Sequence, residues 1–548
     1  MERHLRRRWF PLLPRRCRGV GTLSSNWLNW ALSATRGLRD GIDSRPQSPS
    51  YGCADPEFWR ERRRGMCNAA TQGAALPLAQ MALYDGPQDF QVDEEERREL
   101  LALSMAALRY GLGLVARDGS IPSRCAAERS PLTTALAAAP LFEAACLLHE
   151  HLDAELQREV ERASMRCSGF MVRFNEPRIS TFNGLLAAWV VDRAAKAGRL
   201  PSLHLKARDM LERSLEPSGF GGRLMVEGNG RDPAMAAACL GILARFGNGE
   251  IPRSLRRRCR SLAQQLAELT MPGGPLAGGC GSAFGGLALP FGAACLGVDL
   301  AHHGGLDQAQ RWHPLSAAWI CSDLWHAAVR GLAQGEPSAE HGHVPFILAQ
   351  HQAHGLRGLA DPERGLCFGL SFGDGANIVL DEGVLVEVKG LGLCATGMPD
   401  AGLRYRLDQG RWQCNGASKL LRDPRFQRPL PYWSRLNSDL AYQVYRRRSD
   451  RLQRPPLGPV EFRRELRFNE RSVICVDELR YQIDLPIVSI KIGGPLPYVE
   501  RLFGLSRAAA LPGSVAVPPE DVARLMREGR LRITRELGEQ GLTSVTFD

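Results

Sequence analysis

The chain has 548 residues, of which 44% are hydrophobic and 24% charged, so it is long enough for two or three domains with sizeable cores. Its formal net charge is +11, but fourteen arginines and only six acidic residues lie in residues 1–64. The excess positive charge therefore belongs mainly to the N-terminal arm. A nucleic-acid-binding protein is not expected, because such a protein carries its basic residues as a patch on the folded body.

Residues 1–84 are predicted to form a basic, partly disordered N-terminal arm. Its apolar stretch WFPLLP is short, contains two prolines and is followed by arginines, which is not typical of a secretory signal. No run of about 20 apolar residues occurs in the chain, so we expect no membrane-spanning helix and a cytoplasmic protein. A short amphipathic helix around Trp27 and Trp30 would allow peripheral contact with an anionic membrane surface. The alternative is an arginine-rich leader without a partner.

The fifteen cysteines are scattered and include no CxxC pair. Structural metal sites usually take their cysteines in close pairs, and disulfide-rich scaffolds are short and dense in cysteine. We therefore expect buried thiols in a reducing compartment, with no metal and no cofactor. His351 and His354 are three residues apart, but no acidic third ligand stands at helical spacing beside them.

Residues 85–360 are predicted to be helical, because apolar residues recur there at intervals of three and four. Loops rich in Gly, Pro, Asp or Ser separate these segments, and their spacing suits stacked antiparallel helix pairs. The segments that show the pattern are residues 97–116, 133–152, 181–198, 232–247, 254–270 and 314–332.

Residues 361–548 change to short runs in which apolar and polar residues alternate, with turn residues between them. A series of such runs predicts an antiparallel β-sandwich domain. The runs are residues 365–372, 376–381, 384–390, 440–448, 460–468, 471–480, 487–494, 531–537 and 543–548. The expected fold class is thus α+β multidomain, with helices first and strands second.

Five segments, in this order, resemble the heparinase II/III-like polysaccharide lyases, of which this chain would be a divergent member. They are DGSIPS (residues 118–123), TFNG (residues 181–184), GGRLMVEGNGRDPAM (residues 221–235), GGPLAGGCGSAFGG (residues 273–286) and the segment 459–479. The resemblance implies an incomplete (α/α) toroid followed by antiparallel β-sheets, and an acidic polysaccharide or oligosaccharide as partner. It gives no oligomeric state.

The segment from Gly221 to Asn248 begins as a glycine-bent polar loop and ends as an alanine-rich helix. Asp232 is suited to cap this helix and Pro233 to be its first residue. The resemblance places the loop at the mouth of a toroid, where Arg231 would pair with a sugar carboxylate. The substrate-binding residues it implies are Glu227, Asn229, Arg231 and Asp232. For the first three, a salt bridge within the loop is the alternative.

β-Elimination at a uronate needs a group that neutralises the carboxylate, a base for the adjacent proton and an acid for the leaving oxygen. In the resembling family an asparagine or histidine of an inner helix neutralises the carboxylate, and Asn183 matches it here. The family also places a histidine near the start of the β domain, which implicates His341 and His343. An exposed histidine-rich helix and a helix-capping asparagine are the structural alternatives.

The family's usual base is a tyrosine, but this chain has no tyrosine between Tyr110 and Tyr405. Whether the protein is an enzyme is therefore left open by the sequence. We consider a polysaccharide lyase, a non-catalytic relative that binds acidic glycans in surface-polysaccharide metabolism, and a toroid glycoside hydrolase that uses carboxylates.

Overall fold

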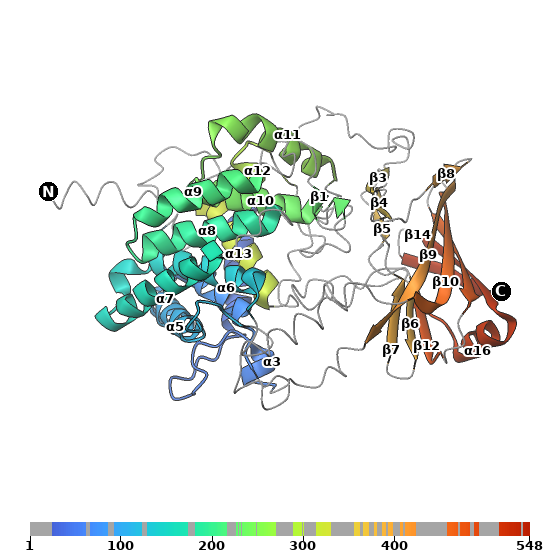
Figure 1. Ribbon diagram of the computed structural model, residues 1–548, viewed down its shortest axis with the longest axis horizontal. Coiled ribbons are helices and arrows are strands. Elements are labelled where there is room, and N and C mark those ends of the chain that lie inside the picture. The colour runs from blue at the N-terminus through green and yellow to red at the C-terminus, as the bar shows by residue number, and fades with distance from the viewer. Residues whose placement is uncertain are drawn as a thin grey trace.

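A computed structural model gives the fold (Figure 1). The residues that it describes are 25–61, 66–85, 92–122, 129–173, 181–215, 226–227, 230–231, 233–247, 249–269, 289–298, 300, 314–329, 356–361, 365–371, 377–380, 386–390, 393–397, 406–408, 411–422, 457–468, 472–482, 487–492, 515–538 and 541–548. For some of these residues, among them all of those between 356 and 422, only the backbone is described. Within these ranges helices precede strands, as predicted, apart from one two-residue hairpin and one late helix.

Helices make up the described residues from 25 to 329. They are α2 (Ser25–Arg39), α3 (Pro56–Trp59), η1 (Ala69–Ala74), α4 (Ala75–Ala82), α5 (Glu94–Gly113), α6 (Pro131–Leu147), η3 (His149–His151), α7 (Ala154–Arg173), α8 (Thr181–Ala197), α9 (Ser202–Leu215), α10 (Pro233–Phe246), α11 (Arg253–Leu269), α12 (Phe291–Ala294) and α13 (Pro314–Val329). Capping explains several starts: the Asp93 carboxylate accepts a hydrogen bond from the Glu96 amide of α5, and Ser130 accepts one from Thr133 of α6.

The helices form two layers, because short loops join successive helices that then pack side by side. The inner helices α4, α6, α8, α10, α12 and α13 contact one another in that order, and α13 also contacts α4. Helices α5, α7, α9 and α11 each pack on the inner helix or helices next to them in the chain. The inner helices are apolar on nearly every side, which is typical of helices buried in a large core.

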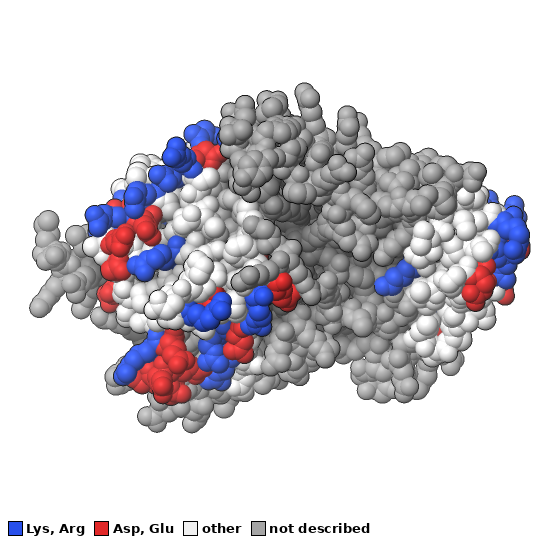
Figure 2. Space-filling model, turned by 90° about the horizontal axis from the view of Figure 1, so that it is seen from below, with Lys and Arg blue, Asp and Glu red and all other residues white. Residues whose placement is uncertain are grey.

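The outer helices are amphipathic. In α11 the buried residues Cys259, Leu262 and Leu266 recur at intervals of three and four, and the arginines at 256, 257 and 260 are exposed. Figure 2 shows that basic and acidic side chains are interspersed over the described helices on the face in view. The described surface in that view carries no large field of one sign.

Strands dominate the described residues from 356 to 547. They are β3 (Leu356–Asp361), β4 (Gly365–Ser371), β5 (Asn377–Leu380), β6 (Val386–Gly390), β7 (Leu393–Gly397), β8 (Arg406–Asp408), β9 (Arg411–Arg422), β10 (Leu457–Phe468), β11 (Val473–Tyr481), β12 (Ser489–Ile492), β13 (Val515–Ala516), β14 (Arg530–Gly538) and β15 (Gly541–Phe547). The main sheet has the order β13-β12-β6-β7-β9-β10-β11-β14-β15, with β8 on β9, and β3-β4-β5 form a second sheet. Every described pairing in both sheets is antiparallel, as the sequence predicts.

The predicted β domain also contains one helix that the sequence analysis did not expect, because residues 519–528 form α16 (Pro519–Glu528). This helix contacts β14, β11 and β12, and its Val522 and Leu525 belong to the apolar cluster of the sheet. Local signals account for the helix: a proline at its start, two acidic residues in its first turn, and Gly529 with φ +76° after its end. The predicted strand at residues 440–448 lies outside the described residues.

The prediction that residues 1–84 form an arm outside the core is wrong for the described residues after Ser25. Helix α2 packs on α13, and Leu28, Leu32 and Leu38 are buried in the same apolar cluster as the other helices. The Trp325 indole donates a hydrogen bond to the Thr35 hydroxyl at 2.8 Å. Composition misled the prediction because twelve of the fourteen arginines in residues 1–64 lie outside α2, whose apolar residues recur at helical spacing.

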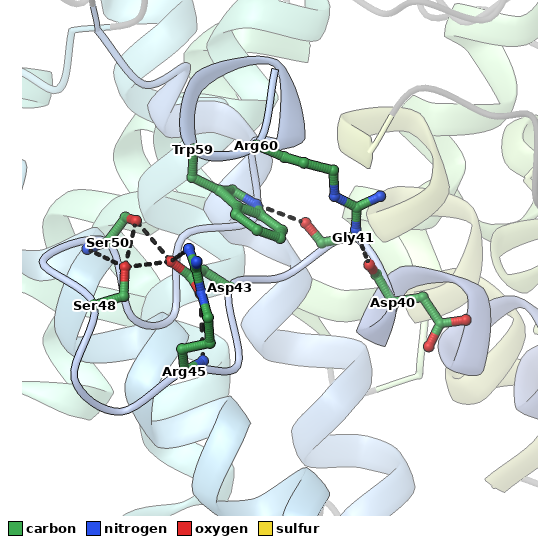
Figure 3. Close-up of polar contacts among 8 residues, drawn as sticks. All are labelled: Asp40, Gly41, Asp43, Arg45, Ser48, Ser50, Trp59 and Arg60. Atoms are coloured by element: carbon green, nitrogen blue, oxygen red, sulfur yellow. Dashed lines mark hydrogen bonds and ion pairs between the residues drawn. The ribbon is translucent and has the colours of Figure 1, made fainter. Parts of the chain in front are cut away.

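Polar contacts fold the segment after α2 back on itself (Figure 3). The buried Asp43 carboxylate accepts hydrogen bonds from the Arg45 guanidinium and from the hydroxyls of Ser48 and Ser50, at 2.6–3.0 Å. These bonds, with Arg45 first, hold the pKa of Asp43 well below its usual range. Trp59 donates to the Gly41 carbonyl at 3.0 Å, which ties α3 to the end of α2.

Among the described residues, no helix is long and apolar enough to cross a membrane.

Candidate functional site

The inner helices α6, α8 and α10 run in the same direction, because α7 and α9 return the chain between them. Contacts between equivalent positions show how these helices are aligned along their axes. Counted from its first residue, each of the three helices has a charged residue at the same position, and α13 has a histidine at that position. These residues are Glu143, Arg193, Arg245 and His326.

The four residues meet in the buried interior of the helices. The Nε of Arg193 lies 3.5 Å from Oε2 of Glu143, and the Nε2 of His326 lies 2.7 Å from Oε1 of the same carboxylate. Arg193 also donates a short hydrogen bond to the Arg245 carbonyl. Because matching positions touch, the N-terminal ends of α6, α8 and α10 must also lie at one end of the helical part. We call this the mouth end.

Three of the predicted site residues, Asn183, Glu227 and Arg231, lie at the mouth end. Asn183 is in the first turn of α8, where its side chain is half-buried. Glu227 and Arg231 belong to the hairpin formed by β1 (Val226–Glu227) and β2 (Gly230–Arg231), directly before Pro233 starts α10. Because α8 and α10 are adjacent and run in the same direction, the first turn of α8 and the hairpin share one end of the helix pair.

The mouth end is turned toward the strands in the view of Figure 1. Strand β1 lies between the end of α10 and strands β3–β5, and helix α11 contacts β3. The positive ends of the helix dipoles of α6, α8 and α10 also point there, which favours a negatively charged group at this end. A carboxylate-bearing sugar has the charge that such an end attracts.

The other predicted site residues have no described position. Asn229, Asp232, His341 and His343 lie outside the described residues, as do His351 and His354. The backbone of Glu227 and Arg231 is described, but their side chains are not. Helix α10 does begin at Pro233, as predicted, while the capping role of Asp232 remains a prediction.

The sequence analysis missed the buried ionic cluster of Glu143, Arg193, Arg245, Asp323 and His326. Each of these side chains is at most 2% exposed, except His326 at 15%. The Arg245 guanidinium lies 3.1 Å from the Asp323 carboxylate, whose other oxygen accepts a hydrogen bond from the Phe291 amide at 2.8 Å. The signal in the sequence was the presence of a few charged residues within otherwise apolar helices.

Burial and mutual attraction shift the pKa values in this cluster in different directions. Burial raises the pKa of Asp323 to about 6, although Arg245 acts against it. Burial acts to raise the pKa of Glu143 as well, but Arg193 and His326 hold it well below its usual range. Burial lowers the pKa of His326. At neutral pH Glu143 is therefore a carboxylate that lies beside a neutral His326.

Aromatic rings enclose the second arginine of the cluster. The Arg245 guanidinium carbon lies 5.4 Å from the ring centre of Trp189, 5.8 Å from that of Trp319 and 5.9 Å from that of Phe291. Arg193 and Asn183 are ten residues apart in α8, so the cluster lies about 15 Å along the helix axis from the mouth end. At that depth it fixes the helices against one another and lies away from the mouth end.

Among the described residues, no group of three or more His, Cys, Asp and Glu side chains is arranged to hold a metal ion. In the ionic cluster described above, Glu143 pairs with Arg193 and His326, and Asp323 pairs with Arg245. The described part of the candidate site therefore offers an amide, helix N-termini and a polar hairpin as the groups available for ligand recognition.

Comparison with known proteins gives two outcomes. No protein-family model matches the chain, and no curated protein matches it. Among solved structures, the chain is similar to the chondroitin AC lyase of Streptomyces coelicolor A3 in complex with chondroitin sulphate, with 13% identity, a TM-score of 0.46, and coverage of 89% of this chain and 71% of that chain. It is also similar to a xanthan lyase of Paenibacillus, with 9% identity, a TM-score of 0.39, and coverage of 85% of this chain and 46% of that chain.

Proposed function

We propose that this chain binds an acidic polysaccharide at the mouth end of its helices and cleaves it by β-elimination at a uronate, as the heparinase II/III-like lyases do. The observation that carries the proposal is the common direction of α6, α8 and α10. It brings Asn183 and the β1–β2 hairpin to the end where three helix dipoles favour a carboxylate.

In this proposal the side-chain N–H of Asn183 donates a hydrogen bond to the uronate carboxylate. This makes the proton on the adjacent carbon of the sugar more acidic. Arg231 pairs with a carboxylate of the polysaccharide, and Glu227, Asn229 and Asp232 bind sugar hydroxyls. His341 and His343 transfer the protons, one as base and one as acid. The helices would form an incomplete (α/α) toroid that includes residues 85–360, and residues 361–548 a β-sandwich domain beside its mouth.

The second candidate is a glycan-binding protein without catalysis. One observation favours it: the stretch between Tyr110 and Tyr405 contains no tyrosine to serve as base. Binding at the mouth end needs only the helix ends, Asn183 and the hairpin, all of which this candidate retains.

A screen of uronate-containing polysaccharides tests both candidates. A lyase produces an unsaturated uronate, which absorbs in the ultraviolet, whereas a binding protein gives binding by calorimetry and no product. New reducing ends without that absorbance would show hydrolysis instead and would contradict β-elimination. Failure to bind any acidic polysaccharide would contradict both candidates.

Variants assign the roles within the screen. H341A/H343A should abolish product formation and leave binding intact, because proton transfer is needed only for cleavage. H151A is the matched control, since His151 is exposed after α6, at the far end of that helix from the mouth. Unchanged turnover in H341A/H343A would remove the histidines from the mechanism.

A further inference from the structure

Two cysteines meet in the segment that joins α2 to the inner helices. The sulfur atoms of Cys53 and Cys67 lie 3.5 Å apart, and the two residues are 0% and 2% exposed. A disulfide needs the sulfurs at about 2.0 Å. The two thiols are thus the described cysteine pair that could be joined with the sulfurs already in contact.

The backbone on both sides of the pair is fixed by hydrogen bonds. The Asp55 carboxylate accepts from the Asn68 amide at 2.8 Å, which joins the residue next but one after Cys53 to the residue after Cys67. The Gln72 side chain, in the orientation that satisfies both of its ends, donates to the Gly52 carbonyl and accepts from the Ala54 amide, at 3.1 and 3.0 Å. The fold itself therefore holds the two sulfurs side by side.

Close packing against α5 holds the same turn from the other side. Gly52 has φ +85°, and a Cβ at this position would lie 2.3 Å from the Ala106 carbonyl group. A glycine is therefore required for the turn and for the approach to α5. The chain passes from Gly52 directly to Cys53, so the position of that sulfur is set by a tightly constrained turn.

We propose that Cys53 and Cys67 form a structural disulfide when the chain folds in contact with a disulfide oxidant such as glutathione disulfide. One thiolate attacks the oxidant and forms a mixed disulfide, and the other cysteine's thiolate then displaces the second glutathione. Two protein thiols lose their protons and two electrons, and one glutathione disulfide becomes two glutathiones. Because both sulfurs are buried in the folded chain, the exchange belongs to folding, before the segment closes.

The bond would fasten the N-terminal segment to the helical core. The loop that it closes carries Trp59 and Arg60, whose side chains donate to the backbone carbonyls of Gly41 and Asp40 (Figure 3). Cys67 lies directly before η1, which contacts α6 and α13. The disulfide thus links the turn after α2 to the centre of the inner layer, and the chain would gain stability only where an oxidant is present.

Peptide mapping of the full chain tests the proposal. The protein is produced once in a reducing and once in an oxidising bacterial compartment, its free thiols are alkylated after unfolding, and its peptides are identified by mass spectrometry. We expect a linked pair of peptides containing Cys53 and Cys67 in the oxidised protein, and two alkylated cysteines in the reduced one. Soluble, folded protein from the oxidising compartment with both cysteines alkylated would overturn the proposal.

Thermal unfolding gives a second readout. The oxidised protein should have a Tm higher than the reduced protein by on the order of 5 °C, because the bond restricts the unfolded chain. C53S should abolish this difference, whereas C167S, which removes a buried thiol of α7, should keep it. An oxidation-dependent rise in Tm that persists in C53S would assign the effect to other cysteines and overturn the proposal.

Discussion

The helical and sheet parts both bury charged side chains, but they collect them over different distances along the chain. In the sheet, the Asp477 carboxylate lies 2.6 Å from Nε of Arg464 and 2.9 Å from Nη2 of Arg535, and the three residues come from the adjacent strands β10, β11 and β14. In the helices, each member of the ionic cluster stands on a different helix or at a different level. The buried charges of the sheet come from three neighbouring strands. Those of the helical part come from helices α6, α8, α10 and α13.

The two arrangements fix register in different ways. Arg464 is directly paired with Asp477 in the ladder, so a slip of one residue between β10 and β11 would turn one of them to the other face. In the helices, a slip of one helix along its axis would separate Glu143 from Arg193. Burying charges costs free energy that their attraction offsets only in good geometry. We therefore infer that both sets specify alignment more than they add stability.

The largest expected effect comes from removing the shared carboxylate of the sheet. D477N leaves Arg464 and Arg535 buried together without a counter-charge, and should lower the free energy of unfolding by about 3–5 kcal/mol. Urea denaturation followed by circular dichroism measures the change. E478Q, at the next residue along β11 and on its other face, is the matched control and should change it by less than about 0.5 kcal/mol. If D477N and E478Q lowered the free energy of unfolding equally, the pairing of Asp477 with the two arginines would not be important for stability.

A smaller loss is expected from the corresponding change in the helices. E143Q removes one carboxylate, but glutamine keeps an acceptor oxygen at this position, near His326 and Arg193, and Asp323 stays in the cluster. The expected loss is about 1.5–3 kcal/mol, the range for hydrogen bonds to charged groups. E150Q, at an exposed residue of η3, is the control. If E143Q lowered the free energy of unfolding more than D477N does, the buried charges of the helices would matter more for stability than those of the sheet.

The pH dependence of the helical part sharpens the comparison further. The folded state favours neutral His326, because burial lowers its pKa, so its contribution is complete above the unfolded pKa of about 6.5 and is lost as pH falls toward the folded value. H326Q cannot titrate. The Tm difference between H326Q and the natural chain should therefore move in favour of H326Q between pH 7 and pH 5.

Other groups near His326 are present in both H326Q and the natural chain, so their own effects on Tm cancel in this comparison. Glu143 contacts it from α6, the Phe291 ring lies 5.1 Å away on α12, and the charges of Arg193 and Arg245 act from α8 and α10. Asp323, with a raised pKa of about 6, stabilises the fold as pH falls, in both proteins alike. A Tm difference that stays constant from pH 7 to pH 5 would show that His326 does not titrate on unfolding.

The elements that the sequence predicted correctly are those with a clear period or a long apolar run between loops. Helix α11 and strands β10, β11 and β14 have apolar residues at helical or alternating spacing, and they lie where that spacing places them. Helices α6, α8, α10 and α13 are apolar on nearly every side, but each is long and bounded by loop residues, and they too lie where they were predicted. Residues 69–82 were missed because η1 and α4 are buried on all sides, and a uniformly apolar stretch has no period. The amphipathic helix expected around Trp27 and Trp30 is present as α2, but its apolar residues pack on α13.

The candidate site was predictable in part for the same reason. Pro233 and the polar loop before it marked the start of α10, and Asn183 stands in the first turn of α8 as proposed. The ionic cluster was not predictable, because Glu143, Arg193 and Asp323 are paired only through the packing of separate helices. A lone charge in an apolar helix indicates that some partner exists, and only the fold identifies it.

The smallest expected effect on stability is also the one most informative about function. N183D keeps the shape of the side chain and places a negative charge in the first turn of α8, where the helix dipole favours it. The Tm should therefore stay the same or rise slightly. The same charge would repel a uronate carboxylate at the mouth end, and the amide donor that neutralises it would be lost.

N183D is most informative when its Tm and its turnover are measured on the same protein. If the polysaccharide screen yields a substrate, turnover should fall by about 100-fold to 1000-fold, the cost of losing one donor to a developing negative charge. N29D, at an exposed asparagine of α2, is the control and should leave turnover unchanged. A stable N183D with full turnover would show that Asn183 only supports its helix, and the site would then lie elsewhere than the mouth end of α8.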